Sequence, residues 1–360
     1  MKKLLLSLVV FAFAAPVSAR VVVGAGRMGE YLPMLEGRRV GVVTNHTGVL
    51  DGRHLVDTLL ARGVRIEAIF APEHGFRGTA VAGEHVDDSR DAATGLPVIS
   101  LYGANRKPRA ADFKRYDVIV FDIQDVGCRF YTYLSTMYYV METCAETGVP
   151  LVVLDRPNPN GMYVDGPILD VSKHRSFVGM LPVPVVHGMT LGELARMING
   201  EGWLAGGVQC ELTVVACEDY KRDMRYVLPV APSPGLPNMR AVLLYPSLCY
   251  FEATKVDLGR GGEASFQLLT YPDGTTVDLR SAPSDDAVIS GGIDLKYLTE
   301  AFRAIGGGEK FLSSFFELLM GVDWVRPMIE AGRPAAEIEA RWADDVARFT
   351  EQRRPYLIYE

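Results

Sequence analysis

The segment Pro72-Glu73-His74-Gly75-Phe76-Arg77-Gly78 places an acid, an imidazole, an aromatic ring and a guanidinium group next to one another. It follows the apolar run at residues 66–70 after one further residue, Ala71, and loops at the end of a buried strand commonly carry the chemistry of α/β proteins. A carboxyl group in partly apolar surroundings can keep its proton and deliver it to a leaving group. Glu73 is therefore the first candidate for a general acid, with His74 and Arg77 as substrate-binding neighbours.

Similar polar clusters follow four other apolar runs of the chain. Their members are Asn45 and His46; Tyr102; Asp122, Gln124, Asp125, Arg129, Tyr131 and Tyr133; and Asp155, Arg156, Asn158 and Asn160. Acids and amides bond hydroxyl groups and aromatic rings stack on sugar rings, so this set suits a carbohydrate. The arginines indicate that the ligand also carries an anion, because a guanidinium fork matches a carboxylate or phosphate. Besides His74 and Arg77, the residues predicted to bind the substrate are Asn45, His46, Arg129, Tyr131, Tyr133, Asp155, Arg156 and Asn158, together with His187 and Arg260 from later in the chain.

Glycoside hydrolysis is a reaction that fits this inventory. It needs a protonated acid at the leaving oxygen and a second group that assists water or the anomeric carbon. Asp122 and Asp125 are the candidates for the second group beside Glu73. Each residue also has a structural alternative, because an acid at a strand end can bond neighbouring loop amides and a histidine can cap local backbone groups. Arg129 can likewise serve only as a partner of Asp125.

The elements that must position these residues form a regular alternation. Apolar runs lie at residues 39–44, 65–71, 97–101, 117–122 and 150–155, and helical patterns lie between them at 55–62, 110–115 and 134–147. Continuous apolar runs separated by helices predict an α/β fold with a Rossmann-like, doubly wound and mainly parallel sheet. The carboxyl ends of parallel strands meet at one edge of a sheet, so we expect the five polar clusters to converge on one crevice.

A literal GxGxxG motif occurs at Gly24-Ala25-Gly26-Arg27-Met28-Gly29. Its context does not favour a dinucleotide site, because the preceding apolar run is three residues long. The next strand ends in Thr44-Asn45, where an acid that binds the ribose would be needed. We interpret the motif as a lead-in to a helix at residues 30–35.

The pattern loosens after residue 166, and we predict a domain boundary near residue 205. An N-terminal domain of residues 20–205 would then precede a smaller α+β domain of residues 206–360. Thr190 is the expected N-cap of a helix at 191–199, and a short strand is expected at 212–215. The proline-rich residues 228–237 predict an extended, exposed connection. Further helices are expected at residues 295–305, 311–319 and 335–351.

Residues 1–19 have the pattern of a secretory signal peptide: a basic start, a short apolar run and the small-residue site Val17-Ser18-Ala19. Cleavage there would leave a chain that begins at Arg20, predicted to be periplasmic or secreted and without a membrane span. Loss of Lys2 and Lys3 takes the formal charge from −7 to −9. An acidic chain without a basic cluster is not typical of nucleic acid binding.

Other function classes lack their signatures. The five cysteines show no CxxC pair and form neither a metal-ligand pattern nor a disulfide framework, so we expect most of them to be buried. The chain contains no GxSxG motif, no P-loop and no HxxxH or HxH spacing. No cofactor and no metal are therefore predicted. A sugar-binding protein without catalytic activity stays open, because such proteins also place two α/β domains around a cleft.

Five motifs resemble the exo-β-N-acetylmuramidase family of peptidoglycan hexosaminidases. They are Thr44-Asn45-His46-Thr47-Gly48, the segment from Pro72 to Gly78, Phe121-Asp122-Ile123-Gln124-Asp125-Val126-Gly127, Arg129-Phe130-Tyr131-Thr132-Tyr133 and Leu154-Asp155-Arg156-Pro157-Asn158-Pro159. The resemblance implies release of N-acetylmuramic acid from the non-reducing end of peptidoglycan fragments, without a metal or organic cofactor. It also implies a cleft between a Rossmann-like domain and a smaller domain, with Glu73 as the proposed catalytic residue. The lactyl carboxylate of muramic acid would explain why arginines accompany a sugar site.

The sequence departs from the family pattern in its C-terminal part. Glu252-Ala253-Thr254 has alanine where the family usually has glycine, and Gly259-Arg260-Gly261-Gly262-Glu263 replaces a typical Gly-Arg-Gly-Thr-Asp. A few tens of residues are also lacking between Gln267 and Asp278, which predicts a thin C-terminal sheet and a more open cleft wall. Two hypotheses result: a muramidase in which Asp122, Asp125 or the substrate's own 2-acetamido group assists Glu73, or a muropeptide-binding protein without turnover.

Overall fold

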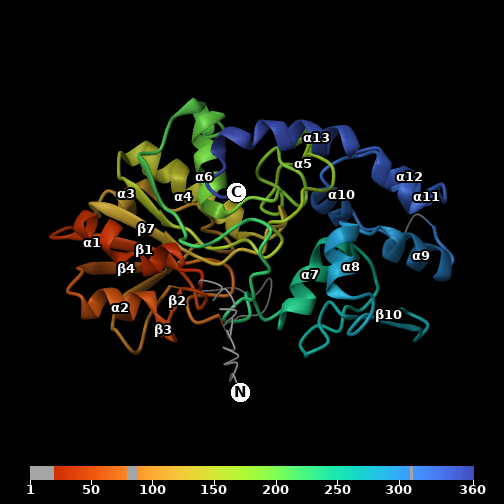
Figure 1. Ribbon diagram of the computed structural model, residues 1–360, viewed down its shortest axis with the longest axis horizontal. Coiled ribbons are helices and arrows are strands. Elements are labelled where there is room, and N and C mark those ends of the chain that lie inside the picture. Colours follow the sequence, from red (N-terminus) through yellow and green to blue (C-terminus); the bar gives the residue numbers. More distant parts are fainter. Residues whose placement is uncertain (1–19, 79–87, 309–310) are drawn as a thin grey trace, which may run out of the picture.

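A seven-stranded sheet forms the centre of the N-terminal domain in the computed structural model, which describes residues 20–78, 88–308 and 311–360 (Figure 1). The strand order is β5-β6-β4-β1-β7-β8-β9. The bounds are Val40–Thr44 (β1), Ile66–Ala71 (β4), Ser89–Arg90 (β5), Pro97–Ser100 (β6), Val118–Asp122 (β7), Leu151–Leu154 (β8) and Leu212–Val215 (β9). All pairings are parallel except that of the edge strand β5. The chain runs outward from β1 to one side and then to the other, which is the doubly wound order with its switch point beside β1.

Helices cover both faces of this sheet. One face packs on α1 (Met28–Leu35) and α2 (Leu55–Ala61), and the other packs on α3 (Ala110–Phe113), α4 (Tyr133–Thr147) and α6 (Leu191–Gly200). Alternate strand residues enter the two cores: Val42 and Val120 face the first, whereas Val43 and Phe121 face the second. Successive side chains of a strand point to opposite faces, so a strand that is buried on both sides is apolar throughout. The predicted Rossmann-like sheet is confirmed.

The GxGxxG segment has a packing role. Gly24–Gly26 form a short 3-10 helix that leads into α1. A Cβ atom on Gly24 would lie 2.3 Å from the Val215 carbonyl oxygen and 2.6 Å from the Asp155 backbone nitrogen. Only glycine therefore lets this segment approach the ends of β8 and β9, and its backbone N–H donates to the Asp155 carbonyl at 2.8 Å.

The predicted domain boundary near residue 205 lies too early. Strand β9 pairs with β8 through Val215, so the N-terminal sheet extends beyond that boundary. The smaller domain follows, with α7 (Met239–Leu248) and the 3-10 helix η3 (Cys249–Ala253) near the cleft. Its other elements are the hairpin β10 (Leu268–Thr270)–β11 (Thr276–Asp278) and helices α8 (Asp285–Gly291), α9 (Lys296–Ala304), α10 (Phe315–Met320), α11 (Val325–Glu330) and α12 (Ala335–Ala340). In the described part of this domain the sheet has two strands.

The C-terminal end returns to the N-terminal domain. The helix expected at 335–351 is two helices, and the second, α13 (Ala343–Gln352), leads back toward α6 (Figure 1). Beyond it the Tyr356 hydroxyl donates to Glu201 at 2.7 Å, at the end of α6. Residues 206–360 are therefore not one separate unit, because their last segment belongs to the packing of the first domain.

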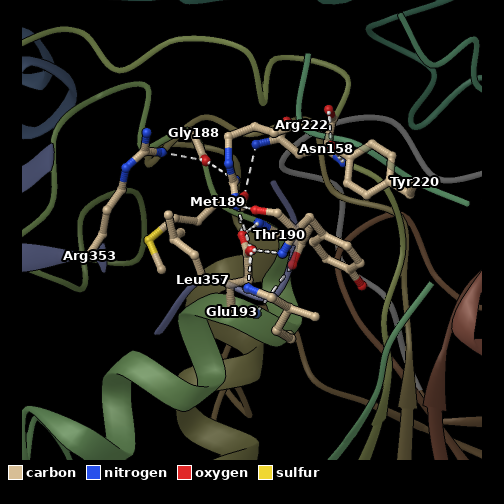
Figure 2. Close-up of polar contacts among 12 residues, drawn as sticks. Asn158, Gly188, Met189, Thr190, Glu193, Tyr220, Arg222, Arg353 and Leu357 are labelled. Atoms are coloured by element: carbon tan, nitrogen blue, oxygen red, sulfur yellow. Dashed lines mark hydrogen bonds and ion pairs between the residues drawn. The ribbon is translucent and has the colours of Figure 1, made fainter. Parts of the chain in front are cut away.

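A buried glutamate at the start of α6 holds this returning segment (Figure 2). Thr190 and Glu193 form a capping box, as expected for the predicted N-cap. The Glu193 carboxylate also pairs with Arg222 at 2.6 Å and accepts the backbone N–H of Ile358 at 2.8 Å. Nearby, Arg353 donates to the Gly188 carbonyl at 2.6 Å. One carboxylate thus ties three distant segments together.

The remaining short elements are the hairpin β2 (Val49–Leu50)–β3 (Arg53–His54), helix α5 (Val171–His174), and the 3-10 helices η2 (Ala205–Gly207) and η4 (Arg354–Tyr356). All five cysteines are free and buried, as expected. Among the described residues, no helix is long and apolar enough to cross a membrane. The predicted signal peptide, residues 1–19, lies outside the described residues.

Candidate active site

A pocket of about 460 Å³ lies between the two domains. Of the predicted site residues, the structure brings five to its wall: Glu73, His74, Tyr131, Tyr133 and Arg260. The smaller domain contributes Tyr245 from α7, Glu252 from η3, and Phe266. The expected cleft between the domains is therefore present.

Glu73 is placed by the sharp turn that follows β4. His74 has a φ of +72° and Gly75 a φ of +73°, so the chain reverses immediately after the acid. A left-handed conformation is uncommon for a residue other than glycine and is concentrated at functional sites. The Glu73 side chain is buried, and the Thr132 hydroxyl donates to its Oε2 at 2.7 Å. Thr132 is the N-cap residue of α4 but makes no side-chain capping bond, so its hydroxyl serves the acid instead.

A second carboxyl group, Glu252, shares the pocket with Glu73. Burial raises the pKa of Glu252, the ion pair and hydrogen bond with Arg260 lower it in part, and the negative charge of Glu73 raises it further. The two carboxyl groups are therefore close enough to interact across the pocket. Glu252 belongs to one of the segments that depart from the family pattern, and the sequence did not predict it as a site residue. No apolar run or spacing linked it to the strand ends of the first domain.

Aromatic rings from both domains form a continuous part of the wall. Tyr245 meets the rings of Phe130, Tyr131 and Phe266 edge to face, with centroids 5.2, 5.9 and 5.1 Å away. Such rings offer apolar faces to the C–H surface of a sugar and exclude water. Tyr102, Phe177 and Arg106 continue this wall on the side of the first domain.

The proline-rich segment is a wall of the pocket rather than an exposed connection. Ser233, Gly235 and Leu236 line the pocket, and Leu236 is fully buried. The Tyr131 hydroxyl donates to the Pro232 carbonyl at 2.9 Å and holds the segment against the first domain. The prediction failed because composition shows that this chain is extended but not what it packs against.

Asp122 does not reach the pocket. Both of its oxygens accept from the Arg156 guanidinium, at 2.6 and 3.0 Å, and both side chains are almost fully buried. Neither residue lines the pocket, so the structure places them in a buried ion pair between the ends of β7 and β8. This geometry favours the structural alternative for both residues.

Asp125 lies behind the pocket wall. Its Oδ2 accepts the Gly127 N–H at 2.6 Å, and its Oδ1 has no hydrogen-bond partner among the residues that the structure describes. Burial raises the pKa of Asp125 to about 7, although the Gly127 and Val126 backbone groups oppose the shift. Its charge acts on the nearby hydroxyls of Tyr131 and Tyr133, but the residue is not part of the pocket lining.

Two arginines predicted to contact an anion are occupied elsewhere. Arg77 forms a forked ion pair with Asp91, at 2.8 and 2.9 Å from one nitrogen, and lies outside the pocket. Arg129 is fully buried and donates to four backbone carbonyls, those of Pro167, Val183, Leu319 and Met320. It joins the two domains and has no ion pair with Asp125.

The other predicted binding residues support the site from outside. Asn45 donates to the Tyr133 hydroxyl at 2.8 Å and so orients a residue of the wall. A second group does not line the pocket, and its polar contacts are internal: His46 with Ala231, Asp155 with Thr190 and Tyr359, Asn158 with Met189, and His187 with Met189. Burial lowers the pKa of His187 to about 3. Burial raises the pKa of Asp155 to about 6 against hydrogen bonds from Thr190 and Tyr359. The positions of these polar residues after the strands predicted that they lie close together. They did not show which side chains face the pocket and which are buried.

Metal ligands do not gather in the described ranges: no group of three or more His, Cys, Asp or Glu side chains there is placed to hold an ion. The arrangement that the structure does present is two interacting carboxyl groups in an aromatic pocket. Two carboxyl groups are what most glycoside hydrolases use to cleave the glycosidic bond.

Comparison with known proteins agrees with this geometry. The family model described as Exo-beta-N-acetylmuramidase NamZ, N-terminal, matches residues 40–240, and the corresponding C-terminal model matches residues 286–359. A curated relative, Peptidoglycan beta-N-acetylmuramidase NamZ of Bacillus subtilis (strain 168), is 36% identical over an alignment 374 positions long, which covers 92% of this chain and 89% of the relative. The chain belongs to the exo-β-N-acetylmuramidase family.

Two solved structures show how closely this exo-β-N-acetylmuramidase family member follows known relatives. Both are described as DUF1343 family proteins of Bacteroides fragilis NCTC 9343. One is 46% identical with a TM-score of 0.87, and the other is 30% identical with a TM-score of 0.79. Each match covers 95% of this chain and 99% of the other. The fold is thus shared over nearly the whole length of the chain, including the smaller domain in which the sequence departs from the family pattern.

Proposed function

We propose that this chain is an exo-acting glycosidase that releases N-acetylmuramic acid from the non-reducing end of peptidoglycan fragments. The observation that carries the proposal is the pair of interacting carboxyl groups, Glu73 and Glu252, in one aromatic pocket of a member of this family. The substrates would be oligosaccharides of muramic acid and N-acetylglucosamine, and muropeptides.

Glu73 is the general acid in this proposal. Thr132 fixes the direction of the carboxyl group, and the adjacent turn holds it at the pocket wall. A correctly directed acid is needed because the leaving sugar oxygen is a poor leaving group until it receives a proton. His74 lines the same wall.

Glu252 replaces Asp122 and Asp125 as the candidate partner. Burial raises the pKa of Glu252 and the ion pair with Arg260 opposes that shift; in its carboxylate form Glu252 can act on the opposite side of the anomeric carbon. It would direct a water molecule there or orient the 2-acetamido group of the substrate. Asp122 is neutralised by Arg156, and Asp125 lies behind the wall.

Leaving-group dependence tests these roles. With MurNAc-GlcNAc as substrate we expect Glu73→Gln to lower kcat by about 10²- to 10⁴-fold, the usual contribution of general acid catalysis. With the activated aryl glycoside 4-nitrophenyl β-N-acetylmuraminide the loss should be much smaller, because nitrophenolate leaves without a proton. Glu252→Gln should slow both substrates alike.

The outcomes separate the alternatives. If Glu252→Gln loses little activity with the aryl glycoside and Glu73→Gln is slow with both substrates, Glu252 is the general acid and Glu73 is its partner. Calorimetric binding of muramic sugars by the wild type without any turnover would support the non-catalytic binding protein instead.

The proposed place of action is the periplasm or the exterior of the cell. The support is the signal-peptide pattern of residues 1–19 together with a polymeric substrate found in the cell wall. N-terminal sequencing of the protein from its native host should find Arg20 as the first residue. An intact Met1 on protein that stays in the cytoplasm would contradict this proposal.

A further inference from the structure

The pocket wall contains one arginine that has no acidic partner within the described ranges. Two arginines line the pocket, and Arg260 is already paired with Glu252. The other, Arg106, is exposed at the wall, and no ion pair joins it to a carboxylate in the described parts of the chain. The next residue, Lys107, cannot take its place because its ammonium group binds Glu142 at 2.6 Å and Glu146 at 2.7 Å.

An aromatic ring holds Arg106 at the pocket. Its guanidinium carbon lies 4.7 Å from the ring centroid of Phe177, which lines the same pocket. Packing of a guanidinium group on a ring restricts a long side chain while its N–H groups remain able to donate. The Arg106 side chain therefore loses less conformational entropy when it binds a ligand, because the ring already restricts it.

A proposed substrate whose non-reducing muramic acid carries no peptide brings an anion into an acidic pocket. N-acetylmuramic acid differs from N-acetylglucosamine by a lactyl ether that ends in a carboxylate. Next to Glu73 and Glu252 such a group is repelled unless a cation faces it. A guanidinium fork can bind a carboxylate through two parallel hydrogen bonds, which adds direction as well as charge.

We propose that Arg106 binds the lactyl carboxylate of the non-reducing sugar and thereby selects muramic acid over N-acetylglucosamine. The inference rests on the proposed function for the identity of the substrate. Arg106 is a specificity-determining residue in this account and takes no part in proton transfer.

Steady-state kinetics with 4-nitrophenyl β-N-acetylmuraminide test the inference. Arg106→Gln should raise KM about 10- to 100-fold with little change in kcat, because a charge-assisted contact present in both the bound substrate and the transition state is lost. Arg106→Lys should restore part of the affinity. Arg341→Gln is the matched control: Arg341 is also exposed and lies 4.5 Å from the centroid of an aromatic ring, that of Trp324, but it is not part of the pocket lining. It should leave both constants unchanged.

Calorimetry with free sugars identifies the group that is recognised. Arg106→Gln should weaken binding of N-acetylmuramic acid and leave the weaker binding of N-acetylglucosamine unchanged. In N-acetylmuramoyl-L-alanyl-D-isoglutamine the lactyl carboxyl is an amide and the free carboxylate lies on the peptide. If Arg106→Gln weakens this ligand but not N-acetylmuramic acid, Arg106 recognises the peptide and the inference is overturned.

The failure of this inference differs from the failure of the proposed function. An active wild type with an unchanged KM in Arg106→Gln overturns the role of Arg106 alone. An inactive wild type whose binding of N-acetylmuramic acid depends on Arg106 overturns the hydrolase and leaves the inference standing. Equal losses for N-acetylmuramic acid and N-acetylglucosamine would show that Arg106 only supports the wall.

Discussion

At the scale of single residues, burial separates the acids that looked equivalent in the sequence. Glu73, Asp122 and Asp155 each end or follow an apolar strand, and all three were predicted to serve the site. In the structure Glu73 lines the pocket, Asp122 meets Arg156, and Asp155 accepts hydrogen bonds from Thr190 and the distant Tyr359. The strand-end position could be predicted from the sequence. The partners could not, because they come from segments far away in the chain.

The buried ion pair predicts the effect of removing Asp122. Asp122→Asn would leave the Arg156 guanidinium buried without a counter-charge, so we expect a loss of about 3–5 kcal/mol in the free energy of unfolding. Urea denaturation followed by circular dichroism measures this. The half-exposed pair Arg39–Asp117 is the control, and Asp117→Asn should cost much less. If Asp122→Asn folds normally and its free energy of unfolding changes little, Asp122 is again a candidate for a catalytic role.

Asp125 predicts a dependence of stability on pH. Its pKa rises from 3.8 to about 7 on folding because the carboxyl group is buried. The folded state therefore binds this proton more tightly than the unfolded state, and its contribution to stability is lost as pH rises from about 4 to about 7. In Asp125→Asn that loss should be absent.

The measurement compares the unfolding free energies of the two proteins across this pH range. Between pH 4 and pH 7, the free energy of unfolding of Asp125→Asn relative to that of the wild type should rise by on the order of 2–4 kcal/mol. Asp155, whose pKa rises to about 6, contributes the same slope to both proteins and cancels in the difference. Parallel curves for the two proteins would mean that the Asp125 carboxyl is not buried in this way.

At the scale of elements, the sequence predicted those that lie within one domain better than those that bridge two. The five strands, the cap at Thr190 and the helices of the sheet follow from apolar periodicity and local capping. The predicted exposed connection at residues 228–237 is instead a wall of the pocket, and α13 crosses back to the first domain. These outcomes depend on tertiary contacts, such as the bond from Tyr131 to the Pro232 carbonyl, that leave no periodic signal.

That bond predicts a role for the Tyr131 hydroxyl in holding the wall. Tyr131→Phe removes the donor to the Pro232 carbonyl, so the proline-rich wall should loosen. We expect kcat/KM to fall about 3- to 10-fold and the free energy of unfolding to fall by about 1 kcal/mol, as for the loss of one buried hydrogen bond. The control is Tyr116→Phe, since Tyr116 is buried away from the pocket and its hydroxyl forms no hydrogen bond with another described residue. Unchanged kinetics in Tyr131→Phe would show that the wall does not need this bond.

At the scale of the whole molecule, the site exists only where the two domains meet. Glu73 and Thr132 come from the sheet domain, whereas Glu252, Arg260 and Tyr245 come from the smaller one. Arg129 couples the two by bonding carbonyls on both sides. The sequence predicted the crevice from the strand ends, but it could not supply the second carboxyl group, because nothing in the chain between residues 239 and 263 indicates which side faces the first domain.

The most direct test of the central claim uses two defined saccharides. Incubated with the wild-type protein, MurNAc-GlcNAc should yield free N-acetylmuramic acid, whereas GlcNAc-MurNAc-GlcNAc, in which the muramic residue is internal, should remain intact. Glu73→Gln should slow the release from the disaccharide by about 10²- to 10⁴-fold at unchanged stability. Cleavage of the internal muramic bond, no cleavage of either saccharide, or an undiminished rate in Glu73→Gln would contradict the account of an exo-acting muramidase with Glu73 as its acid.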